Sequence, residues 1–205
     1  MAIDLKDAYG LKTPEDSRRL YATWAASYDS GFAQAMAYRL PEAVAAAAAR
    51  WHMTGPILDV GAGTGLVGLA LKSYGLGPID GTDIAPEMLE KAAQKSCYAA
   101  FFQGDILAGL ACKSQTYQGI TSSGTFTTGH VGPEALPEIV RLLCPGGLAV
   151  LSVSRAHWHG SNFPRHIDTL PGITARAVDE VSIYGDGAVG DHAADTAYLL
   201  RFRRR

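Results

Sequence analysis

Short apolar runs alternate with helix-like stretches along most of the chain, and this pattern begins near residue 55. Apolar runs at residues 56–60 and 78–83 predict buried strands, and the stretches at residues 66–74 and 86–95 have the spacing of helices. Strands that alternate with helices are typical of βαβ units, which assemble into a parallel sheet. The pattern therefore predicts an α/β fold from this point onward.

The alternation continues toward the end of the chain. The next expected elements are strands at residues 99–103, 118–122 and 148–154, a helix at 133–143 and a turn at 145–147. Residues 173–184 and 196–203 then read as an antiparallel pair of strands across a Gly/Asp-rich loop at 185–191. Together these elements predict a doubly wound α/β sheet of seven strands, mostly parallel, with an antiparallel C-terminal strand.

The segment before the sheet has a different pattern. Residues 14–51 predict two helices, with Thr13 as the cap of the first and an alanine-rich run at residues 42–50 in the second. The pair Ser30-Gly31 is the expected break between them. Helices therefore precede the sheet.

Length and composition fit one ordinary domain. The 205 residues, of which 47% are hydrophobic and 19% charged, suffice for one substantial core but not for a second independent one. We expect a single domain over residues 1–205, made of an N-terminal helical cap at residues 1–54 and a core at residues 55–205.

Charge argues against nucleic acids and membranes as partners. The formal net charge is −2, so the chain has no general attraction to phosphate backbones or anionic membranes. Arg201, Arg203, Arg204 and Arg205 form a cluster that reads as a solvated edge. We therefore expect a small molecule as the partner, with no nucleic acid and no membrane.

Cysteine use and the start of the chain favour a reducing compartment. Cys97, Cys112 and Cys144 are odd in number and widely spaced, which argues for free thiols. Residues 1–10 alternate charged and apolar side chains instead of building the apolar stretch of a signal peptide. We expect a cytoplasmic protein.

A glycine-rich loop follows the first predicted strand of the sheet, and it consists of Gly61, Ala62, Gly63, Thr64 and Gly65. Glycines between a buried strand and a helix let backbone N–H groups and the helix N-terminus approach a nucleotide-like ligand. Two interpretations stay open, because residues 63–68 also fit the dinucleotide pattern G-x-G-x-x-G.

Acidic residues near three strand ends help to separate the two interpretations. Asp59 lies inside the first strand, where a negative charge suits an ammonium-bearing ligand better than a pyrophosphate. Asp83 ends the second strand, where a carboxylate can accept both hydroxyls of a ribose. Asp105 follows the third strand, where it can accept an adenine amine while Ile84 and Ile106 sandwich the ring. The acids favour a nucleoside with an ammonium group over a dinucleotide.

Five stretches of the chain carry a resemblance to a known family. They are residues 21–29 (YATWAASYD), 59–65 (DVGAGTG), 83–89 (DIAPEML), 122–126 (SSGTF) and 130–136 (HVGPEAL). Over residues 18–153 the chain resembles class I S-adenosylmethionine-dependent methyltransferases, whose fold is Rossmann-like. It is most similar to the small family that contains the Williams–Beuren-region methyltransferase-like protein. The resemblance implies S-adenosylmethionine as the cofactor and methyl transfer to a small molecule as the reaction.

The resemblance also implies which residues meet the cofactor. Trp24 and Tyr28 would close over it from the N-terminal helix, and Ser122 and Ser123 would lie beside its methionine part. The glycine loop would hold that part, Asp83 the ribose, and Asp105 with Ile106 the adenine. The full expected cofactor-binding set is Trp24, Tyr28, Asp59, Gly61, Ala62, Gly63, Thr64, Gly65, Asp83, Ile84, Met88, Gly104, Asp105, Ile106, Ser122 and Ser123.

Catalytic groups are less evident. In-line displacement at a sulfonium can gain on the order of 7–11 kcal/mol from positioning alone, so no acid–base pair is required. His130 is the best candidate for a general base, since it follows a strand end and precedes a helix. His157 and His159 form a His-x-His pair without placed carboxylates, and we expect no metal.

The substrate pocket and two alternative functions complete the predictions. Phe126, His130, Trp158 and Phe163 are the expected walls of the acceptor pocket. One alternative is an NAD(P)-dependent oxidoreductase that uses the literal G-x-G-x-x-G pattern. The other is a non-catalytic S-adenosylmethionine-binding protein.

Overall fold

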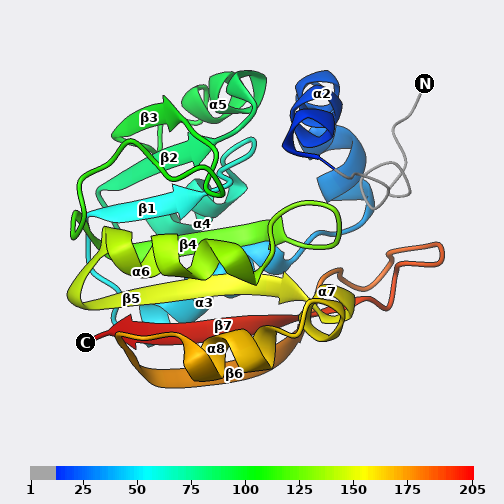
Figure 1. The fold of residues 1–205 in the computed structure, drawn as a ribbon. Helices are drawn as coiled ribbons and strands as arrows, with labels where there is room; N and C mark the ends of the chain where they lie inside the picture. The colour runs from blue at the N-terminus through cyan, green and yellow to red at the C-terminus, as the bar shows by residue number, and fades with distance from the viewer. Residues whose placement is uncertain (1–12) are drawn as a thin grey trace.

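A twisted sheet with helices on both faces makes up the structure, a computed structural model that describes residues 13–205 (Figure 1). The strands are β1 (Ile57–Val60), β2 (Ile79–Asp83), β3 (Ala100–Gln103), β4 (Tyr117–Phe126), β5 (Leu143–Ser154), β6 (Ile173–Ser182) and β7 (Thr196–Arg204). Hydrogen bonds order them β3-β2-β1-β4-β5-β7-β6, and β7 is antiparallel to both of its neighbours. The predicted seven-stranded, mostly parallel sheet with an antiparallel C-terminal strand is confirmed. The prediction that residues 1–10 form no signal peptide lies outside the described residues.

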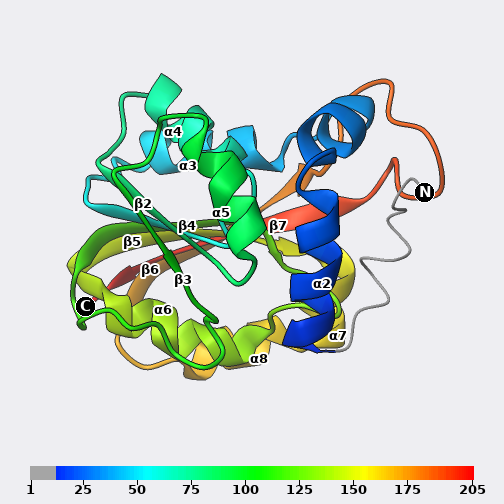
Figure 2. The same cartoon turned by 90° about the horizontal axis from the view of Figure 1, so that it is seen from above.

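Helices cover both faces of this sheet, with α3 and α4 on one side and α6 and α8 on the other (Figure 2). The helical segments are α2 (Pro14–Trp24), η1 (Tyr28–Ala33), α3 (Leu40–Arg50), α4 (Leu66–Ser73), α5 (Pro86–Ala93), η2 (Pro133–Ala135), α6 (Leu136–Leu142), α7 (Arg155–Gly160) and α8 (Phe163–Thr169). Ile57 of β1 joins the core cluster under α3 and α4, and its neighbour Leu58 joins the cluster under α6 and α8. Successive residues of a strand point to opposite faces, so β1 is buried throughout because both faces are covered.

A π-helical segment, η1, occupies the place where a helix break was expected. The predicted break at residues 30–31 is therefore wrong, although α-helices do precede and follow the segment. Tyr28 and Phe32 lie one turn apart with ring centroids 5.2 Å from each other, and Trp24 packs against both rings. This ring packing outweighs the low helix propensity of the glycine within η1.

Several elements differ from the sequence prediction between β4 and β6. The turn expected at residues 145–147 lies inside β5, because Leu143 already pairs with Tyr117 and the register shifts before Gly119. The helix expected at residues 133–143 is divided between η2 and α6. The sequence did not predict α7 and α8, which are too short to show a helical period.

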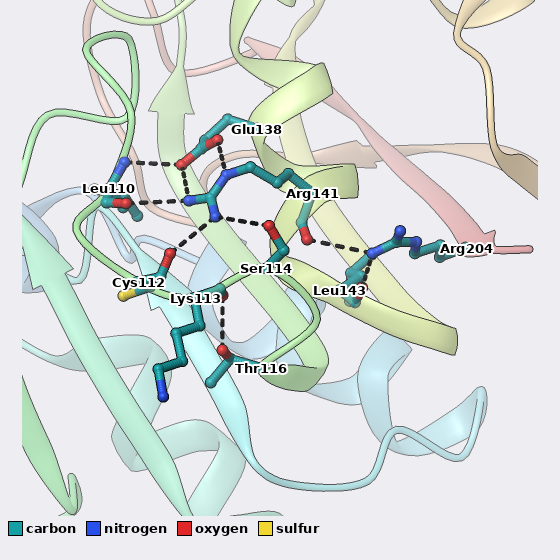
Figure 3. Close-up of polar contacts among 9 residues, drawn as sticks. All are labelled: Leu110, Cys112, Lys113, Ser114, Thr116, Glu138, Arg141, Leu143 and Arg204. Atoms are coloured by element: carbon teal, nitrogen blue, oxygen red, sulfur yellow. Dashed lines mark hydrogen bonds and ion pairs between the residues drawn. The ribbon is translucent and has the colours of Figure 1, made fainter.

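A polar cluster holds the loop after β3 against α6 (Figure 3). The Nε of Arg141 lies 2.6 Å from Oε2 of Glu138, and its guanidinium also donates to the carbonyls of Leu110 and Cys112 at 3.0 and 2.8 Å. Glu138 accepts the backbone N–H of Leu110 at 2.8 Å. Hydrogen bonds from Arg141 lower the pKa of the Glu138 carboxyl. The loop that contains Asp105 is thereby fixed to the helix layer on one face of the sheet.

Three of the arginines near the end of the sequence are held by contacts with the rest of the fold. Arg201 is 6% exposed, forms an ion pair with Asp179 at 2.7 Å, and lies 4.2 Å above the ring centroid of Trp51. Arg204 donates to the backbone carbonyl of Leu143 at 2.5 Å. Arg203 donates to the carbonyls of Gly146 and Trp51 at 2.9 and 2.7 Å. The prediction of a solvated cluster is therefore wrong for Arg201, Arg203 and Arg204, because β7 is an inner strand.

Candidate functional site

A cavity lies at the carboxyl ends of β1, β2, β3 and β4, beside the N-terminal helix α2. It opens to solvent, and the empty space in it and at its mouth amounts to about 1010 Å³; we call it the main cavity. Its lining residues are Ser17, Tyr21, Tyr28, Tyr38, Pro41, Val60, Gly61, Ala62, Gly63, Thr64, Leu66, Val67, Thr82, Asp83, Ile84, Met88, Gly104, Asp105, Ile106, Leu107, Ser123, Gly124, Thr125, His130 and Val131. Open α/β sheets bind their ligands at the carboxyl ends of parallel strands, so this position is the expected one.

Most of the predicted cofactor-binding residues line the main cavity. They are Tyr28, Gly61, Ala62, Gly63, Thr64, Asp83, Ile84, Met88, Gly104, Asp105, Ile106 and Ser123. Four others, Trp24, Asp59, Gly65 and Ser122, do not line it. Tyr21, Tyr38 and Thr82 also face the cavity, and they were not predicted from the sequence. Tyr21 precedes Tyr28 by seven residues, a helical spacing that could have indicated a shared face.

Asp83 supports the glycine loop and also faces the main cavity. Its Oδ2 accepts the N–H of Gly63 at 2.8 Å, and its Oδ1 accepts the N–H of Ala85 at 2.9 Å. Burial raises the pKa of Asp83, and these backbone hydrogen bonds partly oppose the rise. Gly61 has a φ of 68°, and a Cβ there would overlap the side chain of Thr125, so the loop requires glycine at this position. Each carboxylate oxygen has a second lone pair, so Asp83 can still accept hydrogen bonds from a ligand.

Asp59 points into the protein and not into the main cavity. Its side chain is fully buried, where Oδ2 accepts the hydroxyl of Tyr98 at 2.7 Å and Oδ1 accepts that of Thr121 at 3.1 Å. Burial raises the pKa of Asp59 to about 7, although the two hydrogen bonds act in the opposite direction. The expected contact between this carboxylate and an ammonium group of the ligand does not match this geometry. Asp59 instead connects β1 to β4 and to Tyr98.

Tyr98 also accounts for the last glycine of the dinucleotide-like pattern. The N–H of Gly68 donates to the Tyr98 hydroxyl at 3.1 Å, and a Cβ at Gly68 would overlap the Tyr98 ring. A Cβ at Gly65 would lie 3.1 Å from the same ring. The packing of Tyr98 against α4 therefore explains Gly68 without a pyrophosphate.

Asp29 of η1 fastens the N-terminal segment to the glycine loop. Its Oδ1 accepts the Thr64 hydroxyl at 2.5 Å, and its Oδ2 lies 2.6 Å from Nζ of Lys95. Lys95 also donates to the carbonyl of Thr64 at 2.5 Å. We call Asp29, Thr64 and Lys95 the latch. The sequence analysis missed it, because nothing in the local pattern pairs two residues that are 66 positions apart.

His130 lines the main cavity with both ring nitrogens engaged. Its Nδ1 lies 3.2 Å from the carbonyl oxygen of Thr128, and its Nε2 lies 3.0 Å from the hydroxyl of Tyr21. A carbonyl only accepts hydrogen bonds, so Nδ1 bears the proton and Nε2 presents a lone pair. Burial lowers the pKa of His130, which keeps the ring neutral at pH 7. A neutral imidazole can act as a general base when a substrate hydroxyl takes the place of the Tyr21 hydroxyl at Nε2.

A second cavity, which also opens to solvent, adjoins the first; the empty space in it and at its mouth amounts to about 540 Å³, and we call it the aromatic cavity. The two cavities share Tyr21, Tyr28, Tyr38, Gly124 and His130. The other lining residues of the aromatic cavity are Trp24, Phe32, Leu40, Phe126, Thr127, Ser152, Ser154, Ile183 and Tyr184. Phe126 and His130, two of the four predicted walls of the acceptor pocket, thus line this cavity. Trp158 and Phe163 line neither cavity, because their rings stack 5.7 Å apart inside the core, and their prediction as pocket walls is wrong.

Three buried hydroxyl groups in the main cavity have no hydrogen-bond partner within residues 13–205. They are Oγ of Ser17, Oγ1 of Thr82 and Oγ of Ser123. A buried hydroxyl without a partner costs roughly 1–3 kcal/mol, so a ligand that supplies partners gains affinity. With the carboxylates of Asp83 and Asp105, these groups fit a nucleoside cofactor that has ribose hydroxyls and an amine.

Two other kinds of site are absent from the part of the chain that the structure describes. It holds no group of three or more His, Cys, Asp or Glu side chains that could bind a metal ion. His157, one of the His-x-His pair, contacts the carbonyl of Val131 at 3.0 Å and the hydroxyl of Ser161 at 3.1 Å. No helix within residues 13–205 has the length and apolar character needed to cross a membrane.

Comparison with known proteins gives one family match and one curated relative. Residues 57–147 match a family described as a methyltransferase domain. The human Methyltransferase-like protein 27 is 30% identical over 154 residues, which cover 72% of this chain and 62% of that protein. The chain therefore spans less than two thirds of the length of this relative.

Solved structures share the fold at low sequence identity. A candidate S-adenosyl-L-methionine-dependent methyltransferase from Methanococcus maripaludis superposes with a TM-score of 0.65 and 16% identity, over 91% of this chain and 93% of its own. The cyclase SpnF superposes with a TM-score of 0.68 and 18% identity, over 95% and 97% of the two chains. These likenesses show the fold alone, and the cyclase illustrates that one fold hosts more than one reaction.

The strand order and the family match together define the class. The sheet has the strand order of the class I methyltransferase fold, and residues 57–147 match a methyltransferase domain; S-adenosylmethionine is the cofactor of enzymes of that class. Over 154 residues the chain is similar to human Methyltransferase-like protein 27.

Proposed function

We propose that this domain transfers a methyl group from S-adenosylmethionine in the main cavity to a small-molecule acceptor in the aromatic cavity. One observation carries the proposal. Apart from five residues of the N-terminal segment, every residue that lines the main cavity belongs to residues 57–147, the stretch that matches the methyltransferase family. Most of the wall of the main cavity is thus formed by the residues that match the methyltransferase family.

The nucleoside part of the cofactor is assigned to the ends of β2 and β3. Asp83 accepts hydrogen bonds from the ribose hydroxyls with the lone pairs that Gly63 and Ala85 leave free. Asp105 accepts the adenine amine, and its Oδ1 is held in place by the N–H of Leu107 at 2.9 Å. Ile84, Met88, Gly104 and Ile106 line the same end of the cavity as apolar or small neighbours of the ring.

The methionine part is assigned to the glycine loop and the end of β4. Gly61, Ala62, Gly63, Thr64 and Ser123 line this end of the main cavity. Gly65, Asp59 and Ser122 support the loop from behind, since Ser122 donates to the carbonyl of Val60 at 2.7 Å. Tyr28 lines both cavities and therefore borders both ligands, whereas Trp24 lines only the acceptor side.

Positioning supplies most of the catalysis in this proposal. When bound, S-adenosylmethionine supplies a methyl group activated by its sulfonium charge. The two adjoining cavities hold the acceptor beside that group, an arrangement that can contribute on the order of 7–11 kcal/mol. His130, which lines both cavities, takes a proton from the acceptor and contributes roughly 10²- to 10⁴-fold.

Calorimetry on the full chain with S-adenosylhomocysteine and, separately, NADH tests the cofactor assignment. We expect S-adenosylhomocysteine to bind with micromolar affinity and NADH not to bind. The reverse result would overturn the proposal in favour of an NAD(P)-dependent oxidoreductase. Binding of S-adenosylhomocysteine without turnover of any acceptor in a broad panel would favour a non-catalytic S-adenosylmethionine-binding protein.

We further propose that residues 1–205 act as a single cytoplasmic domain related to the Williams–Beuren-region methyltransferase-like family. The 30% identity to human Methyltransferase-like protein 27 supports the relationship. Free thiols at Cys97, Cys112 and Cys144 support a reducing compartment.

A further inference from the structure

A continuous series of rings forms one wall of the aromatic cavity. Ring centroids lie 5.0 Å apart for Trp24 and Tyr28, 5.2 Å for Tyr28 and Phe32, 5.6 Å for Phe32 and Tyr38, and 6.1 Å for Tyr38 and Tyr184. The rings come from α2, η1, the segment before α3 and the segment after β6. Aromatic rings pair with one another face to edge or offset face to face, so this wall favours a flat aromatic ligand.

The described residues that line the aromatic cavity carry no formal charge. Within residues 13–205, no Asp, Glu, Lys or Arg side chain lines it. A carboxylate or phosphate on the ligand would therefore be buried without a counter-charge, which is costly. A protonated amine can bind to ring faces, but it has no lone pair with which to attack a methyl group. These properties favour an uncharged acceptor.

His130, which lines both cavities, indicates which reacting group the acceptor carries. The Nε2 of His130 presents its lone pair, and in this structure it accepts the phenolic hydroxyl of Tyr21 at 3.0 Å. Burial lowers the pKa of His130 below its ordinary value, so this imidazole is a weak base that can take a proton from a phenol, with a pKa of about 10, only in concert with methyl transfer. Aliphatic alcohols are far weaker acids. The geometry is therefore suited to an aromatic hydroxyl.

From these observations we infer that the acceptor is an uncharged, flat aromatic molecule whose hydroxyl oxygen receives the methyl group beside His130. The inference rests on the proposed function, because it names the second substrate of the same site. The acceptor hydroxyl takes the place of the Tyr21 hydroxyl at Nε2 of His130, and its proton passes to Nε2 as the oxygen bonds to the methyl carbon. The bond between that carbon and the sulfonium sulfur breaks with its electron pair on sulfur, which leaves neutral S-adenosylhomocysteine. His130 then releases the proton to water.

Phe32 and Tyr184 provide specific variants, because both line the aromatic cavity and neither lines the main cavity. Tyr74 provides a matched control, since it is 43% exposed and lines neither cavity. Phe32→Leu and Tyr184→Leu should raise KM for the acceptor by about tenfold through lost ring contacts. Both should leave the affinity for S-adenosylhomocysteine unchanged, and Tyr74→Leu should change neither quantity.

The experiment uses the full chain with S-adenosylmethionine and four probes of similar size: naphthol, naphthoate, naphthylmethylamine and the saturated decalinol. Formation of S-adenosylhomocysteine is measured for each probe. We expect naphthol to be methylated at least about tenfold faster than the other three, because only it combines a flat ring, no charge and an acidic hydroxyl. His130→Gln should lower kcat for naphthol by roughly 10²- to 10⁴-fold without raising KM.

Three results would overturn the inference while S-adenosylhomocysteine still binds. They are a preference for naphthoate, the amine or decalinol, no turnover of any probe, and an unchanged KM in both Phe32→Leu and Tyr184→Leu. Loss of folding in one variant is recognised from its melting temperature, and the other variant then decides. Failure of the wild-type chain to bind S-adenosylhomocysteine is a different outcome, since it refutes the proposed function and this inference together.

Discussion

The hydroxyl of Tyr98 donates a hydrogen bond to the buried carboxyl of Asp59 at 2.7 Å and accepts the N–H of Gly68 at 3.1 Å. One oxygen atom therefore connects β1 to the first turn of α4, directly behind the glycine loop. Neither hydrogen bond reaches the main cavity, but both fix the elements that flank the glycine loop. We therefore expect loss of these two hydrogen bonds to lower both the stability of the fold and the affinity for the cofactor.

The first prediction concerns Tyr98→Phe. The variant should lower the free energy of unfolding by about 1–3 kcal/mol, because it leaves a buried carboxyl and a backbone N–H without their partner. Urea denaturation measures the loss. Tyr74→Phe is the control, since it removes an exposed hydroxyl that bonds Glu42 at 2.6 Å, and it should change stability by about 0.5 kcal/mol or less. Equal losses in the two variants would contradict the prediction.

The second prediction concerns pH. Asp59 has a pKa of about 7 in the folded protein against 3.8 as its ordinary value, so the folded state binds the proton more tightly. The stabilisation is complete below pH 3.8 and is lost as pH rises through about 7. Between pH 5 and pH 8 the Asp59 contribution to the free energy of unfolding should fall by about 2–3 kcal/mol. In Asp59→Asn that part of the fall should vanish, and identical pH profiles of the two proteins would show that the carboxyl does not titrate in this range.

The third prediction concerns Asp83→Ala. Removal of the carboxylate should weaken S-adenosylmethionine binding by about 1.5–3 kcal/mol, because charge-assisted hydrogen bonds to the ribose are lost and the N–H of Gly63 loses its acceptor. Calorimetry with S-adenosylhomocysteine measures the change. Asp191→Ala, at an exposed position, serves as the matched control and should bind normally. An unchanged affinity in Asp83→Ala would remove the ribose assignment.

The fourth prediction concerns the latch. Lys95→Met removes the cation 2.6 Å from Asp29 and should speed the dissociation of S-adenosylhomocysteine about fivefold, since an exposed or half-buried pair is worth up to about 1 kcal/mol. Stopped-flow displacement measures this rate. Arg155→Met is the control. It removes an exposed ion pair with Glu180, and neither residue lines either cavity, so the rate should stay unchanged. If Lys95→Met also has the wild-type rate, the latch does not retain the cofactor.

Much of the fold was predictable from the sequence, because strands buried on both faces leave apolar runs that are easy to read. β1 and β2 appear with nearly the expected bounds for this reason. Short helices such as α7 leave no period, and η1 depends on rings that meet only after folding. The conformation of such segments depends on tertiary packing, which the local sequence pattern does not reveal.

Only part of the candidate site could be predicted from the sequence, for the same reason. The loop residues and Asp83 could be predicted, since their positions follow from the strand ends that precede them. The orientation of Asp59 could not, because its partner Tyr98 lies 39 positions later and no spacing rule relates them. The aromatic cavity was equally hidden, since its rings come from distant segments such as η1 and the residues after β6.

The place of β7 in the sheet has a consequence for how the protein is made. β7 lies between β5 and β6, although it is the last of the three to be synthesised. Until residues 196–204 leave the ribosome, the apolar β5 has one unpaired edge and β6 has no strand to join. Unpaired edges of this kind are where nascent chains pair with each other. Self-association during synthesis should therefore depend on how quickly this final strand inserts.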